Sequence, residues 1–448
     1  MAIEKSLDRK LAAIHADPHG CKEFILADAK DADMAYGIGA PGQSPEAHSG
    51  ELRFKTLEEY REQIRANVRQ GMVDIMLMSS STNYQLTLLE RLFENSHITP
   101  AIRANDTTDV HLARGSNYAE HPALPFRSAS LDHAMCGHLD CTPQERHLGA
   151  NLGLYSVTFN NDIQFDIPTL ERFHQFREEA ERKGFRYFLE VFDPNLGSAI
   201  APELLGSYIN DMIARMLAGV AGPGRPVFLK MVYHGPKAME DLVRYDPHLV
   251  VGILGGSSGT TLDAFHLLAE AQKYGAKVAL YGRKINSAEN QLAFIHFLRL
   301  IVERVIEPVD AVKAYHAVLQ KLGVRPQRSL EDDLKLQTNS MSYGGTTTSI
   351  VVSKPAPAAS TNGKAADCKC HDHAPAPVAA SNDHACACHA VEPPKPEPIQ
   401  AARPRVTISS ASERANGFPT LGNGLPDFTK MDVAQRLAYH RARLGLGD

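Results

Sequence analysis

Eight short apolar segments alternate with amphipathic helices over the first three quarters of the chain, and this alternation limits the fold more than any other feature. Strands that alternate with helices are typical of α/β proteins with a parallel sheet. Eight such units favour a closed (β/α)8 TIM barrel, because the early segment 37–42, which carries glycines, is interrupted by a proline and makes a poor nucleotide turn for an open sheet. The predicted strands are 24–27, 73–78, 99–103, 154–160, 187–192, 227–232, 250–254 and 278–281.

The composition divides the chain into three parts. Residues 1–340 are predicted to form the barrel as a catalytic domain, and the excursion 104–153 is longer than a barrel helix needs, which suggests a lid or a subunit contact. Residues 346–404 are rich in Ala, Pro and Ser and poor in large apolar residues, so we expect a disordered linker. The C-terminal segment 405–448 contains one amphipathic helix, predicted over residues 431–444.

The overall composition excludes several classes of protein. The chain has 448 residues, 43% of them hydrophobic, and a formal charge of −5, which gives no reason to expect nucleic acid as a partner. It contains no apolar stretch of membrane-spanning length, and its N-terminus lacks the apolar core of a signal peptide, so we expect a cytoplasmic protein with no membrane partner. Seven unevenly spaced cysteines do not suggest a disulfide framework.

Lys230 is the most informative single residue, because it lies in the middle of an apolar predicted strand. Burial among Phe228, Leu229 and Met231 would remove water from the ammonium ion, and desolvation lowers the pKa of a lysine. A neutral amine can attack a carbonyl group and form an imine. The alternative is a lysine that extends past apolar neighbours to the surface.

Polar residues follow several of the predicted strands. In a (β/α)8 barrel the carboxyl ends of the strands carry the active site. Because side chains alternate along a strand, Lys230, Val232 and His234 are expected on one face. A carboxylate beside the amine is needed to carry protons while an imine forms, and Glu190 could do this or could only form an ion pair. The polar residues at strand ends are Asp28, Lys30, Asp31, Arg103, Asn105, Glu190, Lys230 and His234.

Two glycine-bearing strand ends follow, Leu-Gly-Gly-Ser-Ser at 254–258 and Tyr-Gly-Arg at 281–283. Turns of this kind present backbone N–H groups that can bind phosphate, although a turn that only caps the next helix is the alternative. A buried lysine followed by a phosphate site indicates chemistry on a phosphorylated carbonyl compound. The predicted phosphate-binding residues are Gly255, Gly256, Ser257, Ser258, Gly282 and Arg283.

These segments resemble, in order, those of the class I (Schiff-base) aldolases of the fructose-bisphosphate type. The strand Phe-Leu-Glu-Val-Phe-Asp at 188–193 and the strand Val-Phe-Leu-Lys-Met at 227–231 carry the resemblance together with the two glycine turns. The resemblance implies that Lys230 forms the Schiff base and that Glu190 is an acid/base group. It also implies that Asp28 helps to break the carbon–carbon bond. The phosphate ligands that it implies are Ser257, Gly282 and Arg283.

One strand departs from the family. The fourth predicted strand, 154–160, lacks the second lysine found in some members, and Arg103 could supply positive charge in its place. The resemblance implies a lyase that acts on a phosphorylated sugar or keto compound and needs no cofactor for catalysis. We also expect a homo-oligomer.

Two groups of cysteines and histidines suggest metal binding. His133, Cys136, His138 and Cys141, with His147 beyond them, lie in the excursion and could hold zinc or could be unrelated residues. The second group lies in the linker, and its spacing suggests zinc or cuprous copper bound by a segment that folds around the ion. Its predicted ligands are Cys368, Cys370, His371, His373, His384, Cys386, Cys388 and His389.

Two other functions remain open. The first is a metal-dependent aldolase or sugar-phosphate isomerase that uses the cluster between His133 and Cys141. The second is a catalytically silent barrel that serves as a scaffold, with the metal-binding tail and the terminal helix as its working parts.

Overall fold

The computed structural model describes residues 3–44, 53–197, 200–256 and 259–337, and single residues between 418 and 438. The chain divides into two units, residues 1–360 and 361–448, and nearly all described residues belong to the first. The predicted linker with its eight metal ligands and most of the predicted terminal helix lie outside the described residues.

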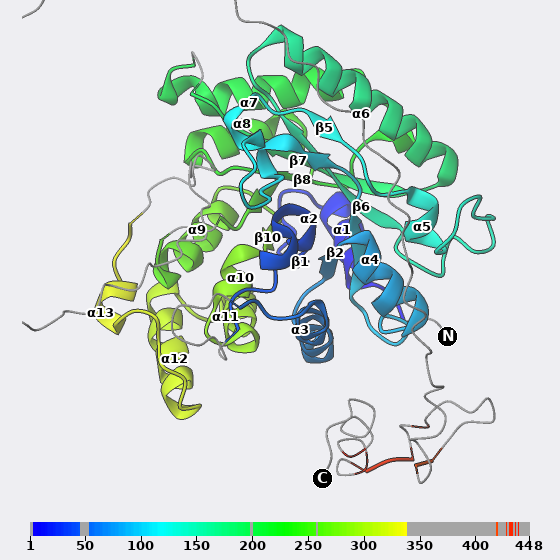
Figure 1. Cartoon of the computed structure of the whole chain (residues 1–448). Helices are drawn as coiled ribbons and strands as arrows, with labels where there is room; N and C mark the ends of the chain where they lie inside the picture. The colour runs from blue at the N-terminus through cyan, green and yellow to red at the C-terminus, as the bar shows by residue number, and fades with distance from the viewer. Residues whose placement is uncertain are drawn as a thin grey trace, which may run out of the picture. The chain divides into compact units, whose positions relative to one another are not determined.

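Eight parallel strands close into a barrel in the order β1-β10-β9-β8-β7-β6-β3-β2 (Figure 1). All eight predicted strands are present, with their ends moved by a few residues, so the (β/α)8 barrel is confirmed. The strands are β1 (Ile25–Lys30), β2 (Ile75–Met78), β3 (Thr99–Arg103), β6 (Leu152–Thr158), β7 (Arg186–Phe192), β8 (Leu229–Met231), β9 (Gly252–Leu254) and β10 (Val278–Tyr281).

Helices surround the barrel, and their ends follow local sequence signals. Thr56 and Glu59 form a capping box before α3 (Leu57–Gln70), and Gly184 ends α6 (Ile163–Lys183) in the left-handed conformation. No described helix combines the length and the apolar character needed to span a membrane. The other helices are α1 (Ser6–Ala16), α2 (Asp33–Tyr36), α4 (Ser80–Asn83), α7 (Pro202–Leu217), α8 (Pro236–Tyr245), α9 (Thr261–Lys273), α10 (Arg283–Ser287), α11 (Gln291–Val302), α12 (Pro308–Lys321) and α13 (Leu330–Asp333), with short turns η1 (Gly37–Gly39), η2 (Tyr84–Leu89) and η5 (Gly222–Gly224).

The core has two layers, and the layer to which a strand residue belongs shows which way its side chain points. Ile25, Ala27 and Ala29 of β1 belong to the apolar cluster inside the barrel. Leu26, one residue along, belongs to the second cluster, which includes Ile64 of α3 and lies between the barrel and its helices. Because alternate residues of a strand share a face, the same rule gives the direction of the polar residues at the strand ends.

The predicted excursion is present between β3 and β6. It contains β4 (Asp106–Thr107), η3 (Thr108–Val110), η4 (Tyr118–Glu120), β5 (Pro125–Phe126) and α5 (Leu131–Met135). β4 and β5 form a small antiparallel sheet of their own. Its role as a lid or a subunit contact stays a prediction.

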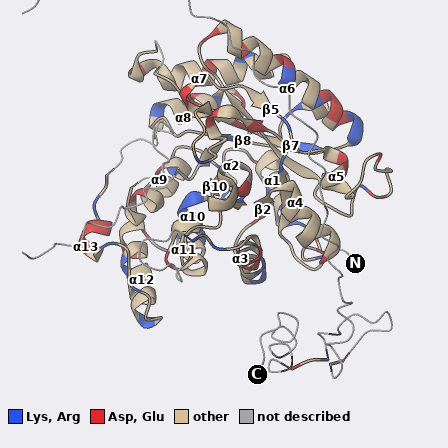
Figure 2. Ribbon diagram, in the orientation of Figure 1, with Lys and Arg blue, Asp and Glu red and all other residues tan. Residues whose placement is uncertain are grey.

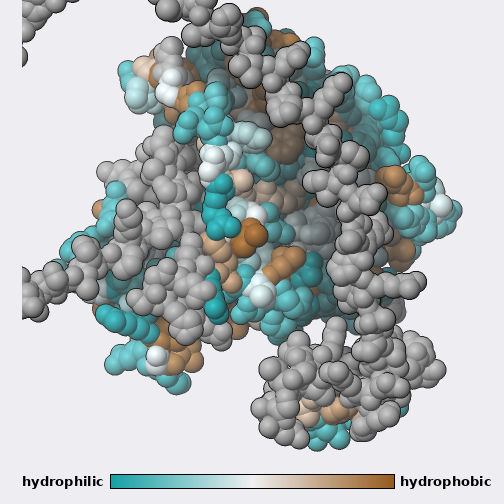
Figure 3. Space-filling view, viewed as in Figure 1, coloured by the Kyte–Doolittle hydropathy of each residue, from teal (hydrophilic) through white to brown (hydrophobic). Residues whose placement is uncertain are grey.

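The outer surface carries charges of both signs. Acidic and basic residues are interspersed along the outer helices, most visibly on α6 (Figure 2). On the face seen in Figure 3, the described hydrophobic residues occur in small groups among hydrophilic ones. The predicted homo-oligomer is not tested by this view and stays a prediction.

Candidate active site

A row of polar side chains crosses three neighbouring strands at their carboxyl ends. Ser156 of β6 is in register with Glu190 of β7, and Glu190 is in register with Lys230 of β8. The residues two positions earlier on each of these strands belong to the cluster inside the barrel. The row therefore points into the barrel mouth, where active sites of this fold are built.

Lys230 and Glu190 form a buried ion pair. The Nζ atom of Lys230 lies 2.5 Å from Oε1 of Glu190, and the two side chains are 8% and 1% exposed. Ser156 donates its hydroxyl hydrogen to the other oxygen of Glu190, Oε2, at 2.6 Å. The predicted burial of Lys230 is confirmed, and the alternative of a lysine that reaches the surface is wrong. The group that meets the amine is a carboxylate that can accept its proton.

Arg103 joins this row to the first strand. Its Nε donates to Oδ2 of Asp31 at 2.6 Å, its Nη2 lies 3.6 Å from Oε2 of Glu190, and its Nη1 donates to Ser156 Oγ at 3.3 Å. Asn105 fixes Ser156 from the other side, because its amide donates to the Ser156 carbonyl at 2.8 Å and accepts the Ser156 N–H at 2.6 Å. Arg103 therefore brings positive charge beside β6, the strand that lacks a lysine.

Asp28 does not lie in the barrel mouth, which corrects the role predicted for it. It shares the outward face of β1 with Leu26, and Asn67 of α3 donates to its Oδ2 at 2.6 Å. Lys30 faces the same way, with Nζ 3.7 Å from Asp28 Oδ1, and burial raises the pKa of Asp28 and lowers that of Lys30. The aspartate that reaches the mouth is Asp31, the residue after the end of β1.

His234 is also placed differently from the prediction. It lies beyond the end of β8, and its Nε2 is 2.9 Å from Oδ1 of Asp193. A Cβ atom added to Gly206 of α7 would come within 2.8 Å of the His234 Cβ. His234 therefore packs against α7, and no contact joins it to Lys230 in the described part of the chain.

Two more carboxylates lie near the mouth: Asp109, which was not found from the sequence, and Asp33, which was an alternative to Asp28. Asp109, from the excursion, accepts a hydrogen bond from the hydroxyl of Thr158 at 3.0 Å, and burial raises the pKa of Asp109. Asp33 accepts from the hydroxyl of Ser79 at 2.5 Å, and burial raises the pKa of Asp33 to about 6. Asp33 can therefore carry a proton near neutral pH. No periodic pattern marks Asp109, so only the tertiary structure reveals it.

The two glycine turns lie on neighbouring strands, β9 and β10. Gly255 donates its N–H to the Leu280 carbonyl at 2.7 Å, and a Cβ atom there would come within 2.3 Å of the Tyr281 ring. Gly255 is thus needed for close packing, and its N–H already has a partner. Gly256 has a φ of +58°, which favours glycine. Ser257 and Ser258 lie outside the described residues.

The second turn places its backbone close to the first strand of the barrel. A Cβ atom on Gly282 would come within 2.8 Å of the Ala29 carbonyl oxygen, so this position also requires glycine. Arg283 follows as the first residue of α10. The two predicted phosphate ligands of this turn therefore lie directly beside β1 at the carboxyl end of β10.

The N-terminus of α9, just after the first turn, is filled by carboxylates. Asp263 accepts the Thr260 N–H at 2.6 Å, and Asp333 of α13 accepts the Thr261 N–H at 2.7 Å. The predicted alternative of a helix cap is therefore correct for Thr260. Lys284, which sequence reasoning missed, donates to the carbonyls of Gly259 and Thr260, and burial lowers its pKa to about 8. It adds a cation beside the turn.

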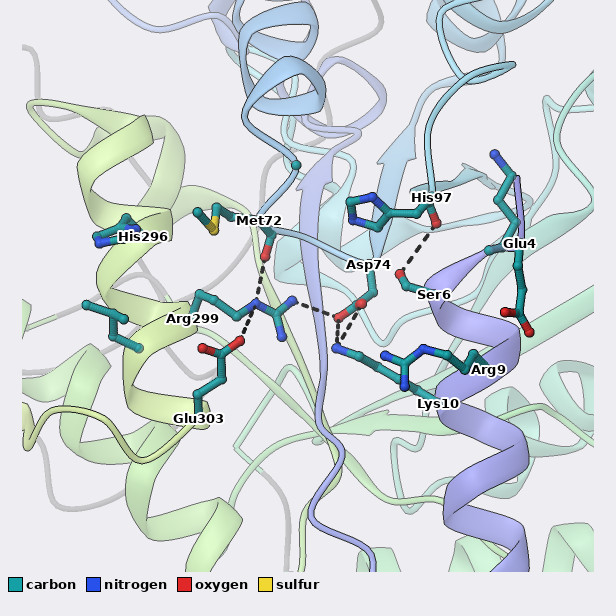
Figure 4. A pocket seen from close by; sticks show the side chains of 13 residues that line it. Glu4, Ser6, Arg9, Lys10, Met72, Asp74, His97, His296, Arg299 and Glu303 are labelled. Atoms are coloured by element: carbon teal, nitrogen blue, oxygen red, sulfur yellow. Dashed lines mark hydrogen bonds and ion pairs between the residues drawn. The ribbon is translucent and has the colours of Figure 1, made fainter. Parts of the chain in front are cut away.

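A pocket of about 540 Å³ lies at the opposite end of the barrel (Figure 4). Its lining includes Lys10 of α1, Asp74, which precedes β2, and Arg299 of α11. Both cations already bind Asp74, with distances of 2.9 and 2.8 Å to its carboxylate oxygens. This pocket surrounds the amino ends of the strands, so it is not the catalytic mouth.

The cysteine and histidine cluster of the excursion is only partly assembled as predicted. Cys136 and His138 come together with Glu145, which sequence reasoning missed, whereas His133 and His147 are not in the group. The adjacent Gly137 lies against the side chains of Tyr84 and Leu88 of η2, a barrel helix. The cluster therefore packs beside η2, and the alternative of a metal-dependent reaction that uses it stays a prediction.

Comparisons with known proteins gave matches among solved structures only. No family model and no curated protein matches the chain. Among solved structures, an archaeal fructose 1,6-bisphosphate aldolase is similar, with 15% identity, 66% of this chain and 99% of the other covered, and a TM-score of 0.45. A fructose-bisphosphate aldolase from Slackia heliotrinireducens is similar at 10% identity, with coverage of 73% and 94% and a TM-score of 0.49.

A decarboxylase is among the similar structures as well. The orotidine 5′-phosphate decarboxylase from Pyrococcus horikoshii is similar at 11% identity, with coverage of 62% and 99% and a TM-score of 0.33. A fold alone does not assign an activity, so function has to be argued from the site.

Proposed function

We propose that this protein is a lyase of the Schiff-base aldolase kind that acts on a phosphorylated keto sugar. The observation that carries the proposal is the buried contact of 2.5 Å between Lys230 Nζ and Glu190 Oε1 at the carboxyl end of the barrel. An amine nucleophile with a general base in hydrogen-bonding distance is the arrangement that imine formation requires.

The first steps use these two residues. Glu190 takes a proton from the Lys230 ammonium group, and the free amine attacks the ketone carbon of the substrate. The proton returns to the carbinolamine oxygen, which leaves as water while the carbon–nitrogen double bond forms. Ser156 and Arg103, both in contact with Glu190, keep its carboxylate in position.

Cleavage then needs a base for the substrate hydroxyl group. The protonated imine takes up the electron pair of the breaking carbon–carbon bond as the hydroxyl proton leaves. Asp31 takes this role in place of Asp28, because Asp31 belongs to the mouth and Asp28 faces α3. The expected consequence is a larger loss of cleavage activity in Asp31→Asn than in Asp28→Asn.

The phosphate group is assigned to the two glycine turns. Gly256 has the positive φ angle that a tight turn needs, and Gly282 lets the backbone approach β1 closely. Arg283 and Lys284 add positive charge to the same end of the barrel. The α9 N-terminus does not contribute, since Asp263 and Asp333 occupy its N–H groups. Ser257 and Ser258 stay predicted ligands.

Borohydride reduction in the presence of a panel of ketose phosphates tests the proposal. A stable adduct on the peptide that contains Lys230 is expected, and none on the peptide that contains Lys30, the other buried strand lysine. Adduct on Lys30 alone would contradict the assignment. Turnover without an adduct and with loss to a chelator would support a metal-dependent enzyme, and no turnover with any substrate would support the scaffold. The cytoplasmic location stays a prediction.

A further inference from the structure

The loop between α5 and β6 brings together three groups that commonly bind metal. The Sγ atom of Cys136, a ring nitrogen of His138 and a carboxylate oxygen of Glu145 all lie within 4.8 Å of one another. The group packs on the outside of the barrel, beside η2, and shares no residue with the Lys230 site. It therefore needs an explanation separate from catalysis.

The distances suit a small tetrahedral ion. Zinc bound to nitrogen and oxygen at about 2.0–2.2 Å separates those ligand atoms by about 3.3–3.6 Å. His138 Nε2 and Glu145 Oε1 are 3.2 Å apart. Only a small movement is thus needed for both atoms to contact one ion.

Each of these two side chains is oriented by a hydrogen bond on its other polar atom. His138 Nδ1 lies 2.8 Å from the Leu139 carbonyl, which directs Nε2 toward Glu145. Thr142 donates both its N–H, at 3.0 Å, and its hydroxyl, at 2.6 Å, to Glu145 Oε2, so Oε1 is presented to His138. A histidine whose second nitrogen binds a backbone carbonyl is the usual arrangement in metal sites.

Cys141 is the candidate for a fourth ligand, although it does not belong to the group of three. Its thiol is buried and interacts with the thiol of Cys136. Positive φ angles at Gly137, +90°, and Asp140, +56°, turn the chain back so that the two cysteines meet. Asp132 accepts the Asp140 N–H at 3.2 Å and stabilises this turn.

We propose that Cys136, His138, Cys141 and Glu145 bind one zinc ion. The ion would cross-link the loop between α5 and β6 on the outside of the barrel. Two thiolates, one imidazole and one carboxylate favour zinc over magnesium or calcium, which prefer oxygen ligands. The ion displaces the two thiol protons when it binds. Because four side chains fill its coordination shell, the site is structural and leaves no position for a substrate.

The test uses the full chain with the tail cysteines replaced, so that tail thiols do not compete. The background variant is Cys368→Ser/Cys370→Ser/Cys386→Ser/Cys388→Ser. Reduced, metal-free protein is titrated with cobalt(II), whose visible absorption reports tetrahedral thiolate coordination, and then with zinc in competition with a chromophoric chelator. One equivalent is expected, with sulfur-to-cobalt charge-transfer absorption.

Two pairs of variants locate the ion. On this background, His138→Ala and Cys136→Ser are expected to weaken zinc binding about 100-fold or more, since even a change in the groups that orient a ligand costs about 10–100-fold. His147→Ala and Cys21→Ser, which change the same residue types outside the group, should leave the affinity unchanged. Thermal unfolding of each metal-free variant checks that it is folded.

Three outcomes would overturn the proposal. They are the absence of tetrahedral cobalt absorption in folded background protein, equal loss of zinc in His147→Ala and His138→Ala, and a disulfide between Cys136 and Cys141 that persists under reducing conditions. Imine trapping at Lys230 does not depend on this site, so its failure would count against the proposed function and not against the zinc.

Discussion

The two ends of the barrel both bury ion pairs, yet they use them differently. At the amino end, the Asp74 carboxylate accepts from Lys10, Arg299 and the backbone N–H of Leu26. Burial alone would raise the pKa of Asp74, but Arg299 and Lys10 outweigh it and hold that pKa below its ordinary value. Asp74 is thus a fixed negative charge whose partners all come from neighbouring elements.

At the carboxyl end, several carboxylate groups interact with a smaller number of positively charged side chains. Arg103 contacts both Asp31 and Glu190, and Lys230 contacts Glu190. Burial raises the pKa of Asp109 and of Asp33, so these groups hold protons more readily than free carboxylates do. Buried carboxylates therefore favour the charged form at the amino end, in Asp74, and the protonated form at the carboxyl end, in Asp109 and Asp33.

The largest expected effect separates two of the buried lysines, Lys230 and Lys10. Lys230→Met should reduce imine trapping by at least about 10⁴-fold, because it removes the nucleophile. Lys10→Met should lower the melting temperature but keep trapping in the folded protein. Borohydride trapping and thermal unfolding of both variants check this. Equal loss of trapping in Lys230→Met and Lys10→Met would contradict the different roles given to the two ends of the barrel.

Glu190→Gln should slow adduct formation about 10²–10⁴-fold, because the amide keeps the shape of the carboxylate but cannot take the Lys230 proton. The rate measured against pH is informative: the deficit should shrink in alkaline solution, where hydroxide can take that proton instead. Asp241→Asn, which changes an exposed partner of Lys237, is the control and should have no effect. A rate equal to that of the unchanged protein at neutral pH would exclude Glu190 as the base.

Asp74→Asn should lower the free energy of unfolding by about 3–5 kcal/mol, since it leaves two buried cations without their carboxylate. Urea unfolding monitored by circular dichroism measures the change. Glu303→Gln is the matched control at the same end, because Glu303 is half exposed and lies 3.9 Å from Arg299; its effect should stay below about 1 kcal/mol. Similar losses in both variants would show that the Asp74 cluster has no special role.

Asp33→Asn should stabilise the protein by about 1–3 kcal/mol at pH 7.5, the smallest of these effects. The pKa of Asp33 rises from 3.8 to about 6 on folding, so the folded state binds its proton more tightly. Stability is therefore lost as pH increases from about 4 to about 6, and the gain from Asn should vanish below that window. Melting temperatures at pH 4 and 7.5 test this sign; a gain that is larger at pH 4 contradicts it.

Much of the barrel could be predicted because its strands are short apolar runs with clear ends. The pairing of Glu190 with Lys230 follows from the same pattern, since both residues lie two positions after an interior residue of adjacent strands. Asp28 was misplaced because the sequence suggested a strand that ends at Ala27. In the structure β1 continues to Lys30, and the alternation turns Asp28 outward.

Asp109 and Glu145 could not be predicted in the same way. Both lie in the excursion, where no repeated pattern shows which residues approach each other. Their positions depend on tertiary contacts with Thr158 and His138, respectively. Local sequence thus determined the scaffold, and long-range folding determined which acids join it.

The contact between α13 and α9 has a consequence for any shortened version of the chain. Asp333 accepts the Thr261 N–H, and the Lys335 carbonyl accepts the Thr260 hydroxyl. Residues close to position 337 therefore bind polar groups at the N-terminus of α9. A protein cut after residue 337 keeps these two hydrogen bonds. A protein cut before Ser329 leaves the Thr261 N–H without its carboxylate, next to the turn to which we assign the phosphate group, and stray sulfate or phosphate would be expected to bind there.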